Sequence, residues 1–162
     1  MTIHKLSRTL SLIAAGLVLT LATTCPAQSQ SGNNQSCNLV IHVDGMRNTT
    51  GKVGTVVFKS PEGWPEDTSK AVIHGPTSIE TTPSGLRATQ IWPNLPPGDY
   101  AVAAIHDENS NHKLDKNMFG WPLEGFGFSN NPHVGLKAPN FTTATFHLAC
   151  PATEIAIHLQ YK

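Results

Sequence analysis

The chain has 162 residues, and its 11 Lys and Arg residues balance its 11 Asp and Glu residues. Only 14% of the residues are charged and 39% are hydrophobic, with 13 Gly and 12 Pro, which is typical of a compact, turn-rich globular domain and not of a disordered chain or a helical bundle. The chain has no excess of basic residues of the kind that nucleic-acid-binding proteins use to contact phosphates, so no nucleic-acid partner is expected.

Residues 1–27 have the pattern of a secretory signal peptide. A short basic start is followed by the apolar run LSLIAAGLVLTL and then by small residues before Gln28. The run is too short to span a bilayer as a stable helix. We therefore expect an exported protein, periplasmic or extracellular, that begins at Gln28. The alternative is lipid attachment at Cys25, which the two threonines before it disfavour.

Removal of this segment changes the charge of the remaining chain. Lys5 and Arg8 leave with it, so residues 28–162 carry 9 basic and 11 acidic side chains, a net charge of −2. The polar stretch 28–36 is predicted to be a disordered leader, and 37–162 is long enough for one domain with a single core. No segment after the leader is long and apolar enough to cross a membrane.

Two cysteines, Cys37 and Cys150, remain in the predicted mature chain. An even number of cysteines in an oxidising compartment indicates a disulfide. Cys37 precedes the first predicted strand and Cys150 follows the next-to-last, so a bridge would tie the start of the domain to a C-terminal hairpin. The alternative is a pair of buried thiols.

Alternation of apolar and polar residues recurs along the domain and predicts strands. In the first run Leu39, Ile41 and Val43 face one side, and the residues between them face the other. The predicted strands, separated by clusters of Gly, Pro, Asn and Asp, are 39–43, 53–58, 71–74, 86–92, 100–106, 143–148 and 155–161. This pattern predicts an all-β fold, an antiparallel β-sandwich of about seven strands of the immunoglobulin or prealbumin (transthyretin-like) type.

Two long connections interrupt the strands. The first, 61–70, is expected to hold one helical turn, with Trp64 as its apolar anchor. The second, 107–141, has little alternation and is rich in Asn, Gly and Pro. A connection of that length in a small domain is usually functional or held by something specific. We therefore expect this long loop to be the functional surface.

Oxygen-bearing side chains recur regularly at the start of the long loop. Asp107, Asn109, Asn111 and Asp115 fall at relative positions 1, 3, 5 and 9, which is the ligand ladder of a calcium-binding loop. The spacing predicts a Ca²⁺ site formed by these four residues, with Glu124 as a carboxylate that folds back to join them.

Two residues depart from an EF-hand. His112 stands where an EF-hand has Gly at its sharp turn, and Met118 stands where it has a bidentate Glu. The flanking helices are missing too, since 100–106 is predicted to be a strand. The alternative is that the Asp and Asn side chains form Asx turns, which satisfy the backbone of the loop without an ion.

Carboxylate and aromatic side chains of the same region offer a second kind of chemistry. Asp107, Asp115 and Glu124 are candidates for the carboxylate pair of a glycoside hydrolase. An aromatic group that could line a sugar or apolar-ligand site consists of Trp121, Phe126, Phe128 and Tyr100. The favoured interpretation is that these rings fasten the loop to the sandwich. No catalytic residue is assigned, because no G-x-S-x-G elbow is present and both cysteines are expected in the bridge.

A longer motif spans the same region. It consists of LPPGDYAV at 95–102, HDEN at 106–109, KLD at 113–115, Gly120, Pro122 and EGFGFSNN at 124–131. This motif resembles the hallmark of a family of small exported bacterial proteins known as domain of unknown function 2141. The similarity implies the fold and export but no activity, and family members usually carry Gly where His112 stands. The LPPGDY element also resembles the strand entry of transthyretin-like and carboxypeptidase-regulatory-like sandwiches.

We therefore expect a secreted or periplasmic β-sandwich that acts as a non-enzymatic binding or accessory module of the cell envelope. Its expected partner is an envelope protein or a glycan, and its expected cofactor is at most Ca²⁺ bound by the long loop. Two alternatives stay open: a carbohydrate-active hydrolase that uses the loop carboxylates beside the aromatic group, and a purely structural module.

Overall fold

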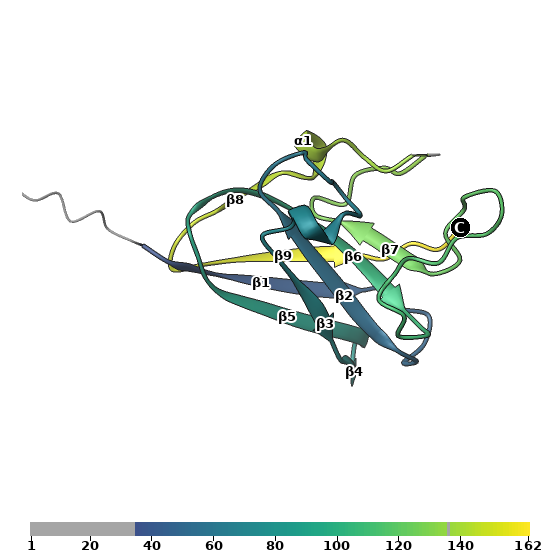
Figure 1. The fold of residues 1–162 in the computed structure, drawn as a ribbon. Helices are drawn as coiled ribbons and strands as arrows, with labels where there is room; N and C mark the ends of the chain where they lie inside the picture. The colour runs from purple at the N-terminus through teal and green to yellow at the C-terminus, as the bar shows by residue number, and fades with distance from the viewer. Residues whose placement is uncertain (1–34, 136) are drawn as a thin grey trace, which may run out of the picture. The chain divides into compact units, whose positions relative to one another are not determined.

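The computed structural model describes residues 35–135 and 137–162, which form two β-sheets packed face to face (Figure 1). The predicted signal peptide and nearly all of the predicted leader lie outside the described residues. The strand order is β4-β5-β1-β9 in the first sheet and β3-β2-β6-β7 in the second, where β8 also pairs with β6. The predicted all-β sandwich is confirmed.

The strands of the first sheet are β1 (Cys37–Asp44), β4 (Ile79–Thr82), β5 (Gly85–Leu95) and β9 (Ala152–His158). Those of the second sheet are β2 (Lys52–Phe58), β3 (Ile73–Thr77), β6 (Gly98–Asp107), β7 (Gly125–Phe128) and β8 (Phe146–Leu148). Neighbouring strands are antiparallel except β1 and β9, which run parallel. The described helical segments are a 3-10 turn at Thr68–Lys70 and α1 (Phe141–Ala144), and no described helix has the length and hydropathy needed to cross a membrane.

The main core lies between the two sheets. In β1 the alternate residues Leu39, Ile41 and Val43 are fully buried, as their alternation predicts. They pack in one cluster with side chains from the facing strands, including Val57 and Val102. Burial of this apolar surface from both sheets is the main force that holds the sandwich together.

A disulfide joins Cys37 to Cys150, whose Cα atoms are 4.6 Å apart and whose positions differ by 113 in the sequence. Closing a loop of roughly a hundred residues stabilises a fold by up to about 4.7 kcal/mol in the chain-entropy model. The predicted bridge is confirmed, but the expected C-terminal hairpin is not formed. Strand β8 pairs with β6 in the second sheet, whereas β9 pairs with β1 in the first, so Cys150 lies where the chain crosses between the sheets.

Strand β7 was not predicted, because it lies within the stretch 107–141 that reads as one long loop. Its residues alternate Gly, Phe, Gly, Phe, so two of the four carry no side chain. A Cβ atom on Gly127 would lie 2.7 Å from Ile157 Cγ2, and one on Gly125 would lie 2.5 Å from Cζ of Tyr161. The glycines therefore allow the C-terminal residues to cross close to the inner face of β7.

The residues after β7 connect three parts of the chain. Ser129 is fully buried, and its Oγ accepts the Val102 backbone N–H at 2.9 Å and donates to the Ala144 carbonyl at 2.6 Å. The side chain of Asn131 donates to the carbonyl of Ala156 and accepts the N–H of His158 in β9. The SNN part of the motif thus ties β6, α1 and β9 together.

Two smaller differences from the predicted strands concern β4 and the start of β8. The short edge strand β4 falls in a stretch where no strand was predicted, and the predicted strand 143–148 begins as the last turn of α1 before β8 starts. The connection 61–70 is as predicted: it contains one 3-10 turn, and Trp64 packs against Phe58, Phe128 and Phe141.

Candidate functional site

A second, smaller apolar cluster lies on the outer face of the second sheet, away from the main core. Register places Val56 of β2, Ala103 of β6 and Phe128 of β7 side by side. The next row on the same face contains Ile105 and its β7 partner Phe126. Because Ala103 is small, the surface is low between its larger neighbours, and it forms the floor of a cleft.

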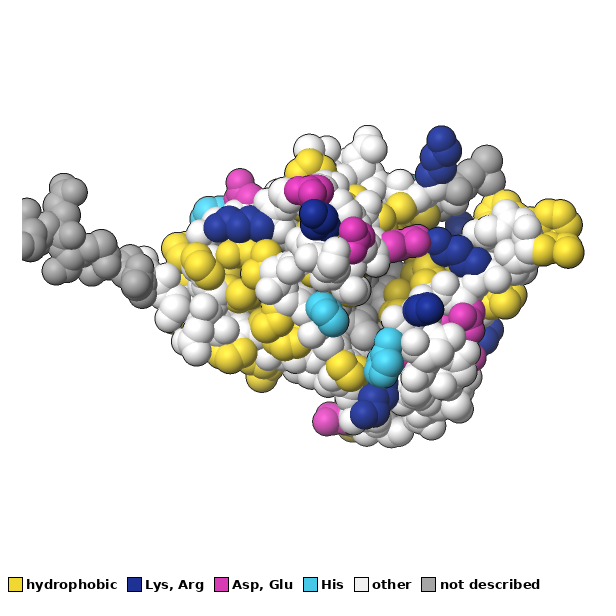
Figure 2. All heavy atoms as spheres, viewed as in Figure 1, with side chains coloured by type: hydrophobic (Ala, Val, Ile, Leu, Met, Phe, Trp, Pro, Cys, Tyr) yellow, Lys and Arg dark blue, Asp and Glu magenta, His cyan; other side chains and the backbone are white. Residues whose placement is uncertain are grey.

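The cleft has a volume of about 920 Å³. Its walls are the long loop at 112–122, the segment 65–68 and residues on either side of position 136. Phe119 and Trp121 lie on the loop wall with 79% and 39% of their surface exposed. Figure 2 shows hydrophobic side chains in a hollow on this face, with charged side chains around it.

The predicted aromatic group is divided by the fold. Trp121, Phe126 and Phe128 line the cleft. Tyr100 lies in the main core between the sheets, fully buried, and donates its O–H to the Pro96 carbonyl at 2.8 Å. Successive residues of β6 face opposite sides of the sheet, so Tyr100 and Ala103 belong to different faces, and including Tyr100 in the group was wrong.

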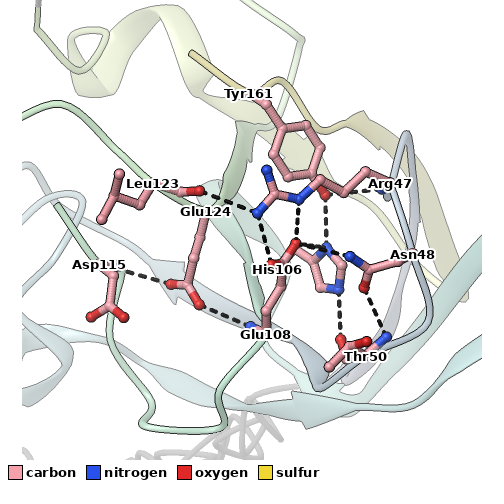
Figure 3. A network of polar contacts seen from close by, with 9 residues as sticks. All are labelled: Arg47, Asn48, Thr50, His106, Glu108, Asp115, Leu123, Glu124 and Tyr161. Atoms are coloured by element: carbon pink, nitrogen blue, oxygen red, sulfur yellow. Dashed lines mark hydrogen bonds and ion pairs between the residues drawn. The ribbon is translucent and has the colours of Figure 1, made fainter. Parts of the chain in front are cut away.

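Glu124 closes the loop that forms the cleft wall. Its side chain is 4% exposed, and its two oxygens accept the backbone N–H groups of Glu108 at 2.9 Å and Asp115 at 3.0 Å (Figure 3). Glu124 folds back onto the loop, as predicted, but the groups it contacts here are backbone donors. One carboxylate thereby fixes the start and the middle of the loop relative to its end.

The four residues of the calcium ladder lie together. Asp107 is buried and accepts the backbone N–H groups of Asn111 at 3.0 Å and His112 at 2.8 Å. The amides of Asn109 and Asn111 donate to the two carboxylate oxygens of Asp115 at 2.6 and 2.9 Å. Two further bonds are the Asx turns of the alternative interpretation: Asn109 Oδ1 accepts the Asn111 N–H at 3.0 Å, and Asn111 Oδ1 accepts the Lys113 N–H at 2.9 Å. Within 35–135 and 137–162 no three His, Cys, Asp or Glu side chains are grouped to hold a metal ion, and calcium binding stays a prediction.

The sharp turn of this loop is formed without glycine. His112 has φ 62°, in the left-handed region, although it replaces the glycine expected for such a turn. A residue with a Cβ atom is less stable there than glycine. The turn therefore keeps the left-handed backbone conformation that glycine favours, although His112 stands at this position.

An ion pair holds the loop to the turn after β1. Arg47 Nε and Nη2 donate to the Glu108 carboxylate at 2.6 and 2.7 Å, and the guanidinium lies 4.8 Å above the Tyr161 ring (Figure 3). This bidentate geometry is the strongest form of such a pair. Hydrogen bonding to Arg47 holds the pKa of Glu108 below its usual value, and the same contact raises the pKa of Arg47.

A fully buried histidine lies beneath this ion pair. His106 Nε2 is 2.8 Å from the Thr50 carbonyl, which only accepts, so Nε2 carries a proton. Nδ1 lies 2.7 Å from the hydroxyl of Tyr161, which in turn accepts the Arg47 backbone N–H at 3.1 Å. Burial raises the pKa of Tyr161. The network links the turn, the end of β6 and the C-terminal segment.

Nothing in the sequence pattern pointed to Arg47 and Tyr161 as partners of the loop. The HDEN motif does contain His106, but its contacts are with residues 55 and 56 positions away in the chain. The signal that was present is the motif itself, which covers 95–131 and so includes His106 but neither Arg47 nor Tyr161. It does not say which residues meet.

Comparison with known proteins identifies the family to which this sandwich and its motif belong. Residues 41–156 match the family described as "Uncharacterized protein conserved in bacteria (DUF2141)". The chain belongs to this family, as the motif predicted. No match is found among curated proteins.

Among solved structures, the chain is similar to a fimbrial assembly protein from Parabacteroides distasonis. The two are 9% identical with a TM-score of 0.38, over 76% of this chain and 52% of the other. The chain thus spans about half the length of that protein.

Proposed function

We propose that this protein is a non-enzymatic binding module of the bacterial cell envelope, and that its ligand lies in the outer-face cleft. The observation that carries the proposal is the cleft itself, about 920 Å³ in volume with an apolar floor. This volume is in the range of small-molecule sites, which are concave and mostly apolar. Exposed Phe119 and Trp121 on its wall form the kind of apolar surface that usually marks a binding site.

Placement in the cell envelope is supported by the cysteines and the N-terminal sequence. The disulfide between Cys37 and Cys150 is a bond that persists in oxidising compartments and is rare in the cytosol. The sequence of 1–27 has the order of a signal peptide, with a basic start, an apolar run and small residues. Both features favour export.

The contacts of the carboxylates favour binding over hydrolysis. Asp107 and Glu124 each accept two backbone N–H groups and are nearly fully buried. Asp115, which lines the cleft, accepts the amides of Asn109 and Asn111. A paired-carboxylate mechanism needs two groups free to face the same bond, and these carboxylates hold the loop.

The test is a fluorescence titration with N-phenyl-1-naphthylamine, an uncharged apolar probe. We expect saturable binding to the wild-type protein and about tenfold weaker binding to Trp121→Ala, which corresponds to about 1.4 kcal/mol. The matched control is Ile91→Ala, since Ile91 is 54% exposed but lies on the first sheet. Absence of saturable binding to the wild type, or equal losses in both variants, would contradict the proposal.

A further inference from the structure

We infer that the ligand is a single-chain amphipathic anion, with its tail on the apolar floor of the cleft and its anionic head group at the lysines around it. The inference rests on the proposed binding function and adds the chemical class of the ligand. It is carried by the unequal distribution of charge on the domain. Residues 28–162 carry 9 basic and 11 acidic side chains, yet the side chains around the cleft have the opposite balance.

Four lysines line the cleft, against two carboxylates. The lysines are Lys113, Lys116, Lys137 and Lys162, and the carboxylates are Glu66 and Asp115. Nearly half of the basic side chains of a net acidic domain therefore surround one cleft. A concentration of one sign of charge in a cleft attracts a ligand of the opposite sign.

The two carboxylates are already engaged by other groups. Glu66 accepts Lys116 Nζ at 2.5 Å, and Asp115 accepts the two asparagine amides described above. In contrast, Lys113 and Lys137 are exposed and have no acidic side chain within 4.0 Å among the described residues. These two ammonium groups are placed to bind an anionic head group.

The apolar floor of the cleft indicates the chemistry of the rest of the ligand. It is formed by Val56, Ala103, Ile105, Phe126 and Phe128. Val56 and Ile105 are half-buried and leave the most apolar surface for an alkyl chain, whereas the other three are 5–7% exposed. A polyanion would gain nothing from this surface, and an uncharged alkane would leave the lysines without a partner. A molecule with one apolar tail and one negative head uses both features, and a long-chain carboxylate is the simplest example.

The test is displacement of N-phenyl-1-naphthylamine by two amphiphiles that share one alkyl chain, both below their micellar concentrations. We expect dodecanoate to displace the probe at a concentration at least about tenfold lower than dodecyltrimethylammonium, because the lysines attract one head group and repel the other. Added salt should reduce this preference, since exposed charges are screened.

The variant that tests the lysines is Lys113→Gln with Lys137→Gln. It should lose the preference for dodecanoate over dodecyltrimethylammonium, which is a ratio of two displacements measured on the same variant. The matched control is Lys52→Gln with Lys59→Gln, which removes the same charge from lysines outside the cleft and should keep the preference.

Failure of the inference and failure of the proposed function give different results. If the neutral probe binds but both amphiphiles displace it equally, the anionic class is wrong and the binding site stands. If the neutral probe does not bind to the wild type, the proposed function itself fails. If phosphatidylglycerol vesicles bind the protein while free dodecanoate does not displace the probe, the lysines recognise the anionic head groups of a bilayer. The inference of a free single-chain ligand is then wrong.

Discussion

The carboxylate of Glu124 accepts the backbone N–H of Glu108 at 2.9 Å across 16 positions of the chain. This bond brings together the two ends of the segment that walls the cleft. The side-chain carboxylate of Glu108 accepts hydrogen bonds from Arg47. The loop is therefore attached both to itself and to the turn after β1. The shape of the cleft therefore depends on a few polar contacts made by Glu108 and Glu124.

Replacing Glu124 with Gln should destabilise the protein. The amide keeps one acceptor oxygen, so one of the two part-buried N–H groups loses its partner, which costs up to about 1–3 kcal/mol. Urea unfolding measures the change. The control is Glu80→Gln, because Glu80 is exposed and has no ion pair in the described chain. Equal stability of the two variants would show that the Glu124 contacts do not hold the loop.

Gly127→Ala should also destabilise the fold, for a steric reason. The new Cβ would lie 2.7 Å from Ile157 Cγ2 and 2.9 Å from the His158 carbonyl, and overpacking of this kind typically costs about 1–3 kcal/mol. Thermal unfolding of Gly135→Ala provides the comparison, since nothing lies within 4 Å of a Cβ at that position. A wild-type midpoint for Gly127→Ala would mean that β9 does not approach β7 as described.

Acid should weaken the attachment of Glu108 to Arg47. The pKa of Glu108 is lowered in the folded protein from its ordinary value of 4.5, chiefly by hydrogen bonding to Arg47. The stabilisation is therefore complete above that ordinary value and is lost as the pH falls through the lowered folded pKa. Unfolding midpoints of the wild type and Glu108→Gln should differ at neutral pH and converge in acid. A difference between the two midpoints that does not change with pH would show that the ionised Glu108 carboxylate does not contribute to stability in this way.

Calcium is tested by thermal unfolding in EDTA and then in excess Ca²⁺. The ladder of Asp107, Asn109, Asn111 and Asp115 predicts a higher midpoint with calcium, because an ion that binds only the folded state stabilises it by RT ln(1 + [L]/Kd). At a concentration of a hundred times Kd this is about 2.7 kcal/mol. An unchanged midpoint, or an equal rise in Asp107→Asn, would end the calcium prediction and leave the Asx turns as the role of the ladder.

The strands that sequence could predict are those with side chains on both faces. Alternation identifies β1 because Leu39, Ile41 and Val43 are all buried and their neighbours are not. It fails for β7, where glycines at 125 and 127 leave no polar face to alternate with the phenylalanines. A short edge strand such as β4 fails for another reason, since four residues hold too little pattern.

In the candidate site, too, the sequence could predict some contacts and not others. Sequence spacing correctly indicated that the Asp and Asn residues of the loop lie near one another, because they are close in the chain. It could not indicate that Glu108 meets Arg47, since that contact spans 61 positions and depends on which strands become neighbours. The cleft is also invisible in the sequence, because its floor comes from β2, β6 and β7 and its wall from the folded loop.

The location of the ligand is the central claim, and amide chemical shifts test it most directly. A titration of isotope-labelled protein with N-phenyl-1-naphthylamine should shift the amides of Ala103, Ile105, Phe126 and Phe128 and the indole of Trp121, all of which line the cleft. Shifts confined to the first sheet, for example around Ile91, or no shifts at saturating probe, would contradict the account.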